Sequence, residues 1–152
     1  MQDQPQHFRH GPFSITTDRT NLDLDAALAL LRRTRWGGGL TRDVLERAAA
    51  NSVCFGLYEG PGLVGFARVI TDLATYAYLT DVVIDEGRRG QGLGRWLVQC
   101  VLVHPDLQGL RRIALVTLGA QALYEPFGFG TDTGALTYME RQDWKQPPEN
   151  TP

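Results

Sequence analysis

The segment between Tyr76 and Val116 constrains the fold of this chain more than any other. Tyr76–Ile84 is rich in aromatic and β-branched residues and is predicted to form a strand. A glycine-dense loop follows it, and apolar residues then recur every three or four positions over residues 93–104, which is typical of a helix. Residues 113–116 are apolar and are predicted to form a second strand. A strand, a helix and a strand in this order make a right-handed crossover that places the two strands parallel.

The rest of the chain predicts further strands and two more helices around this unit. Expected strands cover residues 13–17, 53–58, 63–71 and 135–141, and expected helices cover residues 23–35, 41–51 and, as a short turn, 120–126. The turn sequence Glu59-Gly60-Pro61-Gly62 joins two of these strands in a hairpin. The fold class is therefore α/β: a single-domain, mixed and largely antiparallel sheet flanked by helices, with one parallel strand pair around the glycine loop.

The length and the composition of the ends predict the domain organisation. A chain of 152 residues suits one domain with one sizeable core. Residues 1–11 and 142–152 are polar and contain prolines, so we expect a flexible leader and a flexible tail around a domain at 12–141.

Composition excludes several classes of function. The formal net charge is −2 and there is no basic run, so no nucleic-acid partner is expected. No apolar run approaches the roughly 18–20 residues of a membrane span. The start lacks a secretory signal, so a cytoplasmic location is expected. The histidines lack zinc-like spacing and Cys54 and Cys100 fall in apolar segments, which predicts buried reduced thiols and no metal site.

The loop after Tyr76–Ile84 carries the chemistry. It has glycines at 90, 92 and 94, it is flanked by Arg89 and Arg95, and a helix begins within it. Glycines allow close approach of the backbone, and the unpaired N–H groups of a helix start attract a phosphate or pyrophosphate. A nucleoside-triphosphate loop would need Gly-Lys-Ser/Thr, and a dinucleotide site would need an acid after the next strand; neither is present. A plain tight turn is the remaining alternative.

Two motifs at a fixed distance resemble one family. The loop is similar to the R-x-x-G-x-G signature of the GNAT N-acetyltransferases, with Arg89, Gly92 and Gly94 in the defining positions. About thirty residues on, a segment resembles the family's A-x-x-x-Y-x-x-x-G-F element, with Ala120, Tyr124, Gly128 and Phe129. The resemblance extends from about residue 52 to 130. Within the superfamily, residues 65–68, 71–72 and 104–107 look like those of a set of small bacterial members without an assigned substrate.

The resemblance implies acetyl-CoA as a cosubstrate and no metal. The pantothenate arm would pair with the strand edge at Val82, Val83 and Ile84. The pyrophosphate would rest on the loop and the helix start, formed by Arg89, Gly90, Gln91, Gly92, Leu93, Gly94 and Arg95. The family often has a cofactor-contacting asparagine seven residues before the tyrosine, and here that position is Thr117.

The resemblance also implies catalytic residues. Tyr124 stands where the family places a general acid near the thiolate sulfur, and a packing tyrosine is the alternative. A backbone N–H near Val83 or Ile84 would meet the oxyanion. Asp81 is a candidate proton acceptor because it interrupts an apolar strand, and an aspartate that caps or pairs with an arginine is the alternative. Asp72 and Glu46 are weaker candidates.

The expected function is transfer of an acetyl group to a primary amine by direct attack in a ternary complex. The acceptor is a small molecule or a peptide, and a homodimer is compatible with the sequence. Trp36 and the glycines after it either wall the acceptor site, as this connection often does in the family, or end a helix. A non-catalytic acyl-CoA sensor and an interaction module on the same fold are the alternative functions.

Overall fold

The computed structural model describes residues 4–142. Its centre is a six-stranded sheet in the order β1-β2-β3-β4-β5-β6, antiparallel throughout except for the parallel pair β5 and β6. The strands are β1 (His7–His10), β2 (Phe13–Thr16), β3 (Val53–Glu59), β4 (Gly62–Thr71), β5 (Tyr76–Ile84) and β6 (Arg112–Leu115). The sequence-based expectation of a mixed α/β sheet with one parallel pair is confirmed.

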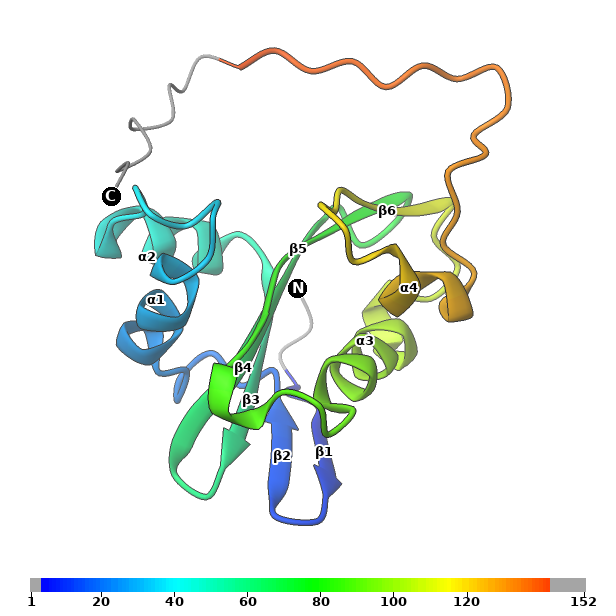
Figure 1. The fold of residues 1–152 in the computed structure, drawn as a ribbon. Coiled ribbons are helices and arrows are strands. Elements are labelled where there is room, and N and C mark those ends of the chain that lie inside the picture. Colours follow the sequence, from blue (N-terminus) through cyan, green and yellow to red (C-terminus); the bar gives the residue numbers. More distant parts are fainter. Residues whose placement is uncertain (1–3, 143–152) are drawn as a thin grey trace.

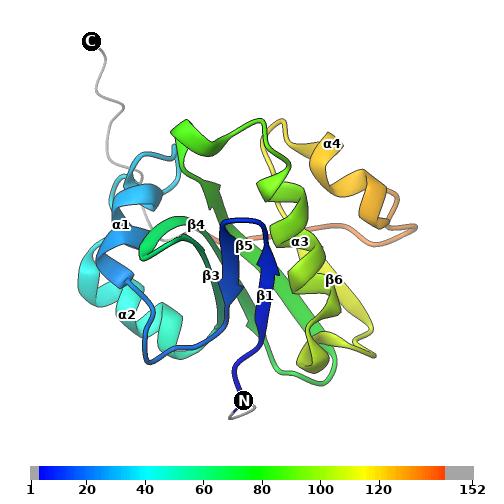
Figure 2. The ribbon, with the colours of Figure 1, turned by 90° about the horizontal axis from the view of Figure 1, so that it is seen from below.

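Helices cover both faces of the sheet (Figure 1; Figure 2). They are α1 (Leu24–Arg32), α2 (Arg42–Ala50), α3 (Leu93–Val103) and the single turn α4 (Gln121–Tyr124), which continues into a 3-10 turn at Glu125–Phe127. The helices α1 and α2 pack on one face around Leu31, Leu45 and Phe66, whereas α3 packs on the other face around Leu97, Val101 and Phe55. No helix within residues 4–142 is long and apolar enough to cross a membrane.

The structure places an additional strand in the expected leader. Strand β1 pairs with β2 across a turn in which Gly11 has a φ of +56°. Phe8 on this strand packs against the core although its neighbours His7 and Arg9 are polar. The polar composition of residues 1–11 therefore concealed a strand that is held by one aromatic anchor and by pairing to β2. The flexibility expected of residues 1–11 stays a prediction, and the first three residues lie outside the described part.

The last expected strand does not form in the described chain. Residue 135 lies in a turn, and residues 136–141 form no strand and pair with no strand of residues 4–142, so that expectation is wrong for this structure. Beyond Phe129, which packs on Tyr124, the chain leaves the domain (Figure 1). The expected flexible tail at 142–152 falls almost wholly on residues 143–152, which lie outside the described residues.

The two parallel strands separate halfway along their length. Tyr76–Leu79 of β5 pairs with Arg112–Leu115, and no pairing follows beyond Leu79 and Leu115. At the point of separation β5 contains a β-bulge, because Asp81 and Val82 together lie opposite the single residue Ala67 of β4. Asp81 has a φ of +56°, which is uncommon for a residue other than glycine. A bulge bends its strand, so it turns the second half of β5 away from β6.

Candidate active site

A cleft of about 1390 Å³ opens where β5 and β6 diverge. One wall is the uncovered edge of β5 over residues 80–84, and a second wall is the chain that follows β6. The remaining walls come from the connection between α1 and α2, the glycine loop with the start of α3, and α4. The diverging strands therefore expose unpaired strand backbone to a large space, which is the arrangement that an extended ligand arm requires.

The cleft collects nearly all of the residues predicted from the sequence. Its lining includes Asp81, Val82, Val83, Ile84, Arg89, Gly90, Gly92, Leu93, Gly94, Arg95, Thr117 and Tyr124. Gln91 is the exception, because it does not line the cleft and its side-chain amide lies 3.4 Å from the Arg88 carbonyl oxygen.

The start of α3 presents backbone N–H groups to this cleft. Gly90 and Gly92 have φ values of +80° and +77°, a region that favours glycine, and Gly92 is the N-cap of the helix without a side-chain cap. The first intrahelical hydrogen bond is donated by Trp96 to Gly92 at 3.0 Å. The N–H groups of residues 93–95 precede it and have no acceptor within the helix. The sequence predicted an anion site at a helix start of this kind, and binding of an anion there stays a prediction.

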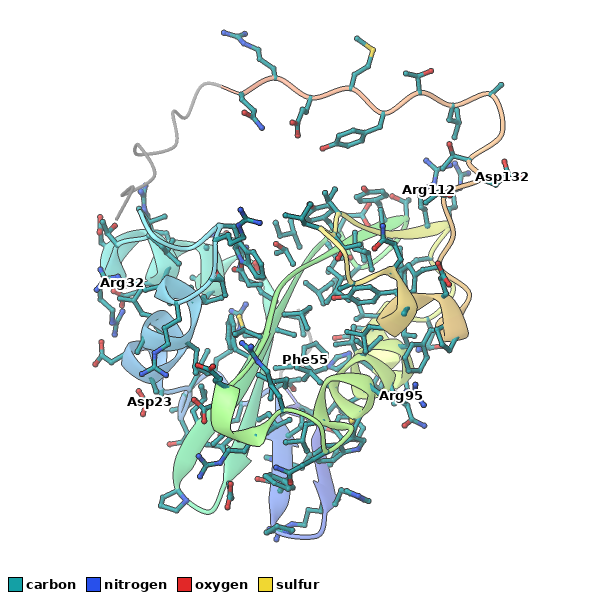
Figure 3. All side chains as sticks on the ribbon, in the orientation of Figure 1. Asp23, Arg32, Phe55, Arg95, Arg112 and Asp132 are labelled. Atoms are coloured by element: carbon teal, nitrogen blue, oxygen red, sulfur yellow. The ribbon has the colours of Figure 1, made fainter. Side chains whose placement is uncertain are left out.

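The arginines around the loop differ in role. Arg88 forms ion pairs with Glu59 at 2.8 Å and Asp85 at 3.2 Å, so it ties the loop to the β3–β4 hairpin and to the end of β5. Arg89 is exposed, and its Nε lies 3.4 Å from the Ile84 carbonyl oxygen at the cleft wall. Arg95 is exposed on the first turn of α3 (Figure 3). Arg89 and Arg95 are therefore placed to contact an anion, whereas Arg88 is already paired.

Tyr124 closes the inner part of the cleft. Its ring contacts Phe129 edge-on at 5.8 Å, and only 8% of the residue is exposed. Burial raises the pKa of its hydroxyl above the ordinary value near 10. Within residues 4–142 no group forms a hydrogen bond with this hydroxyl, so it is available to a ligand. Thr117 also lines the cleft, and its Oγ1 accepts a hydrogen bond from the Ala120 N–H at 3.2 Å, just before α4 begins.

Asp81 is held by an arginine. Its Oδ2 accepts a hydrogen bond from Arg68 Nε at 2.8 Å, and both side chains are mostly buried. Arg68 also donates to Ser52 Oγ at 3.1 Å. Pairing with an arginine was one of the two alternatives for Asp81, and the sequence alone did not identify which arginine. The other candidate bases lie elsewhere: Asp72 accepts hydrogen bonds from the turn before β5, and Glu46 pairs with Arg42 on α2.

The connection between α1 and α2 forms the wall opposite β6. Thr34, Arg35, Trp36, Gly38 and Gly39 line the cleft there. The helix α1 already ends at Arg32, and Thr34 donates from its N–H and its Oγ1 to the Leu31 carbonyl at that end. Trp36 and the glycines follow this turn. Sequence reasoning identified Trp36 and the glycines but missed Arg35, Val116 and Leu118. The only sequence signal of these three is that they lie at or just beyond the end of a predicted helix or strand.

Neither cysteine belongs to this cleft. Cys54 and Cys100 are buried free thiols, and burial raises their pKa values to about 11 and about 12. At neutral pH both stay protonated and are poor nucleophiles. Among residues 4–142 no cluster of histidine, cysteine or acidic side chains has the arrangement of a metal site.

Comparison with known proteins identifies the class to which this fold and cleft belong. The family model described as "Acetyltransferase (GNAT) family" matches residues 23–129. The chain belongs to the GNAT acetyltransferase family, whose members transfer acetyl groups from acetyl-CoA.

Individual relatives support this assignment. A protein of Gibberella zeae named a putative acetyltransferase is 36% identical over 90% of this chain and 86% of its own length. A crystal structure of a putative GNAT-family acetyltransferase from Xanthomonas campestris pv. campestris is 38% identical with a TM-score of 0.82, covering 88% of this chain and 94% of that one. An aminoglycoside N-acetyltransferase in complex with CoA has a TM-score of 0.63 at 17% identity, covering 86% and 95%, which is a likeness of fold.

Proposed function

We propose that this chain transfers the acetyl group of acetyl-CoA to a primary amine of a small-molecule or peptide acceptor, by direct attack in a ternary complex. One observation carries the proposal. A single cleft brings together a strand edge and a Tyr124 hydroxyl that have no partner within residues 4–142, and the N–H groups at the start of α3. These three features suit the arm, the pyrophosphate and the sulfur of one extended thioester substrate.

Acetyl-CoA would lie along β5 and end at α3. Val82 and Ile84 would offer backbone groups to the pantetheine arm, as a neighbouring strand would. The N–H groups of residues 93–95 would bind the pyrophosphate, with Arg89 and Arg95 as charged partners. Thr117 retains a free donor, since its oxygen already accepts from Ala120. Gln91 would contribute only after a change of rotamer, because it lies outside the cleft lining.

The proposed chemistry requires no covalent enzyme intermediate. The amine nitrogen attacks the thioester carbon, and the carbonyl oxygen takes the negative charge, which a backbone N–H of β5 near Val83 or Ile84 stabilises. The carbon–sulfur bond then breaks, the nitrogen loses a proton, and the thiolate receives a hydrogen bond or a proton from Tyr124. The buried, protonated state of Cys54 and Cys100 supports direct transfer over an acetyl-cysteine route.

Asp81 is the proposed acceptor of the amine proton, directly or through water. It is the only carboxylate among the cleft-lining residues of the described chain. Arg68 occupies Oδ2, and the structure records no partner for Oδ1 within residues 4–142. The ion pair would therefore orient the carboxylate while leaving one oxygen toward the cleft.

The acceptor would enter beside the connection between α1 and α2. Trp36 is exposed there and offers a flat apolar surface, and Gly38 and Gly39 keep the entrance open. Gly37 shapes this connection, because a Cβ at its position would overlap the Leu31 carbonyl. We place the reaction in the cytoplasm, where the free thiols of Cys54 and Cys100 would stay reduced.

A panel of amines tests the proposal against a sensor that binds acyl-CoA without turnover. The panel contains amino acids, polyamines, aminoglycosides and peptides, and free thiol release from acetyl-CoA is followed. Calorimetry measures acetyl-CoA binding in parallel. Amine-dependent thiol release supports transfer. Tight binding with no release on any amine favours the sensor, and no binding refutes the assignment of the cleft.

A further inference from the structure

Ser52 is a buried polar residue that does not line the cleft, and only 2% of it is exposed. Its hydroxyl makes two hydrogen bonds. Oγ donates to the Ala48 carbonyl at 2.7 Å and accepts from Arg68 Nη1 at 3.1 Å. Because the single hydroxyl hydrogen is directed to the end of α2, the Ser52 oxygen meets Arg68 only as an acceptor.

The surroundings of Ser52 fix the position of this oxygen. The Ser52 N–H donates to the Ala49 carbonyl at 3.2 Å, directly after the last turn of α2. Arg19 Nη2 donates to the same Ala49 carbonyl at 3.2 Å and also to the Ser52 carbonyl. The end of α2 and Arg19 therefore hold Ser52 in place independently of the cleft.

Arg68 connects Ser52 with the carboxylate that is proposed to accept the amine proton. The guanidinium donates from Nε to Asp81 Oδ2 and from Nη1 to Ser52 Oγ. Its remaining nitrogen, Nη2, has no hydrogen bond within residues 4–142. The planar group is thus held at two of its three nitrogens, by the cleft residue on one side and by the end of α2 on the other.

An arginine beside a carboxylate has a second way to bind it. Nε and Nη2 carry two parallel N–H groups that match the two oxygens of a carboxylate, and such bidentate pairs are among the stronger ion pairs. Here only Nε hydrogen-bonds to Asp81, and Oδ1 has no partner within residues 4–142. Turning the guanidinium to bring Nη2 onto Oδ1 would also move Nη1, and the hydrogen bond to Ser52 opposes that movement.

We propose that Ser52 is a positioning residue, which holds Arg68 in a single-contact pair with Asp81 and so keeps Oδ1 open to the amine proton. The inference rests on the proposed role of Asp81 in acetyl transfer. With both oxygens bound to the guanidinium, the carboxylate would have to break a charge-assisted hydrogen bond before it could accept a proton. Ser52 itself would touch neither substrate and acts only through Arg68.

Ser52→Ala removes the acceptor for Nη1. A crystal structure of this variant should show Arg68 bound to both oxygens of Asp81, and kcat with the best amine should fall at least tenfold. The KM for acetyl-CoA should stay within about twofold, because Ser52 does not line the cleft. An Arg68 that keeps its single contact in the crystal would overturn the proposal.

Asn51→Ala is the matched control for the loss of a hydrogen bond at the end of α2. Asn51 Nδ2 donates to the Arg47 carbonyl at 2.8 Å and does not bond to Arg68. This variant should keep kcat within about twofold, and circular dichroism checks that both variants keep their fold. A loss of kcat in Asn51→Ala as large as that in Ser52→Ala would overturn a role specific to Ser52.

Arg68→Lys separates positioning from a general effect on the fold. An ammonium group has no fork of parallel N–H groups, so the Ser52 acceptor should then matter little. Adding Ser52→Ala to Arg68→Lys should change kcat by less than about threefold, compared with at least tenfold when Arg68 is present. Equal losses in the two backgrounds would show that Ser52 only stabilises the fold, and would overturn the proposal.

The crystal structure and the kinetics together distinguish this proposal from the proposed function. If no amine is acetylated, the proposed function fails, and the contact that Arg68 makes in the Ser52→Ala crystal still decides whether Ser52 positions it. If Arg68 binds both oxygens and kcat does not change, acetyl transfer stands and the role of Ser52 in it is overturned.

Discussion

Replacing Tyr124 by phenylalanine removes the one atom through which this residue is proposed to act. The ring keeps its edge-on contact with Phe129, and the hydroxyl has no partner within residues 4–142, so the free energy of unfolding should hardly change. Burial raises the pKa of the hydroxyl, which makes complete proton transfer to a thiolate, of pKa about 8.5, more uphill. The hydroxyl then acts mainly as a hydrogen-bond donor to the developing charge.

The size of the effect follows from that charge. A hydrogen bond to a charged group contributes about 1.5–3 kcal/mol, so kcat should fall by roughly ten- to a hundredfold. The KM for acetyl-CoA should change little, because the thiolate exists only along the reaction path. The raised pKa also means that Tyr124 stays protonated up to and beyond about pH 10, so it should cause no alkaline loss of rate below that pH.

Steady-state kinetics of thiol release, with the best amine from the panel, measures this change. Tyr78→Phe is the matched control, because Tyr78 also lines the cleft and loses the same atom. It should keep kcat within about twofold. Equal rates for Tyr124→Phe and the wild type would refute the role of the hydroxyl and leave Tyr124 as a packing residue. Equal losses in both tyrosine variants would indicate a general effect on the cleft.

Three further variants test the loop, the acid and a buried histidine. Gly94→Ala should raise the Kd of acetyl-CoA about tenfold or more. Binding of acetyl-pantetheine, which lacks the pyrophosphate, should stay unchanged, and equal losses for both ligands would contradict a phosphate role. Asp81→Asn should lower kcat/KM by about a hundredfold. A lower melting temperature with full activity would instead mean that Asp81 has a structural role, as the partner of Arg68 in the ion pair. His104 is buried and its pKa is lowered, so the unfolded chain binds more protons and stability should fall as pH drops below about 6.5. His104→Asn keeps an acceptor for the Asp106 N–H and should flatten that pH dependence in thermal melts, which an unchanged slope would refute.

Gly94 is the more informative glycine because its backbone is unstrained. A Cβ at Gly94 would meet its nearest neighbours, on Ile84 and Leu123, at an ordinary 3.9 Å. Alanine should therefore fit and even favour the helix by about 0.5–1 kcal/mol. Gly92 has a φ of +77°, so any substitution there strains the loop whether or not a ligand binds. A loss of affinity without a loss of stability at Gly94 would isolate the approach of the phosphate.

The sequence predicted those elements whose patterns depend on local neighbours. Strand β5 has the predicted bounds, and α3 differs by one residue, because glycines mark the start of α3 and Pro105 follows its end. Strand β1 was missed because it is held by one partly buried residue, Phe8, and by pairing with β2, and neither produces a periodic signal. Residues 135–141 do have a strand pattern, yet pairing depends on an available edge, which a single sequence does not specify.

The candidate site was predictable where a motif coincides with a backbone requirement. The glycine loop was identified because left-handed φ values and a helix start limit the residues allowed there. Tyr124 was identified only through the resemblance of its segment to the family motif. Gln91 was included only through its position between two glycines, and its side chain turns to Arg88 instead. The Arg68 partner of Asp81 was not identifiable, because it lies thirteen residues away on another strand and is adjacent only once β4 and β5 pair.

The β-bulge in β5 connects the fold with the proposed chemistry. The extra residue at Asp81–Val82 bends β5 just beyond Leu79, its last partner on β6, so the cleft begins where parallel pairing ends. Asp81 adopts a φ of +56° there, and its ion pair with Arg68 of β4 compensates part of the cost of that conformation. Backbone groups that would otherwise bond to β6 are then left to a ligand. Without the bulge, the β5–β6 ladder would continue and the cleft would close. The extra residue that the bulge inserts opposite Ala67 therefore sets both the shape of the sheet and the access to the site.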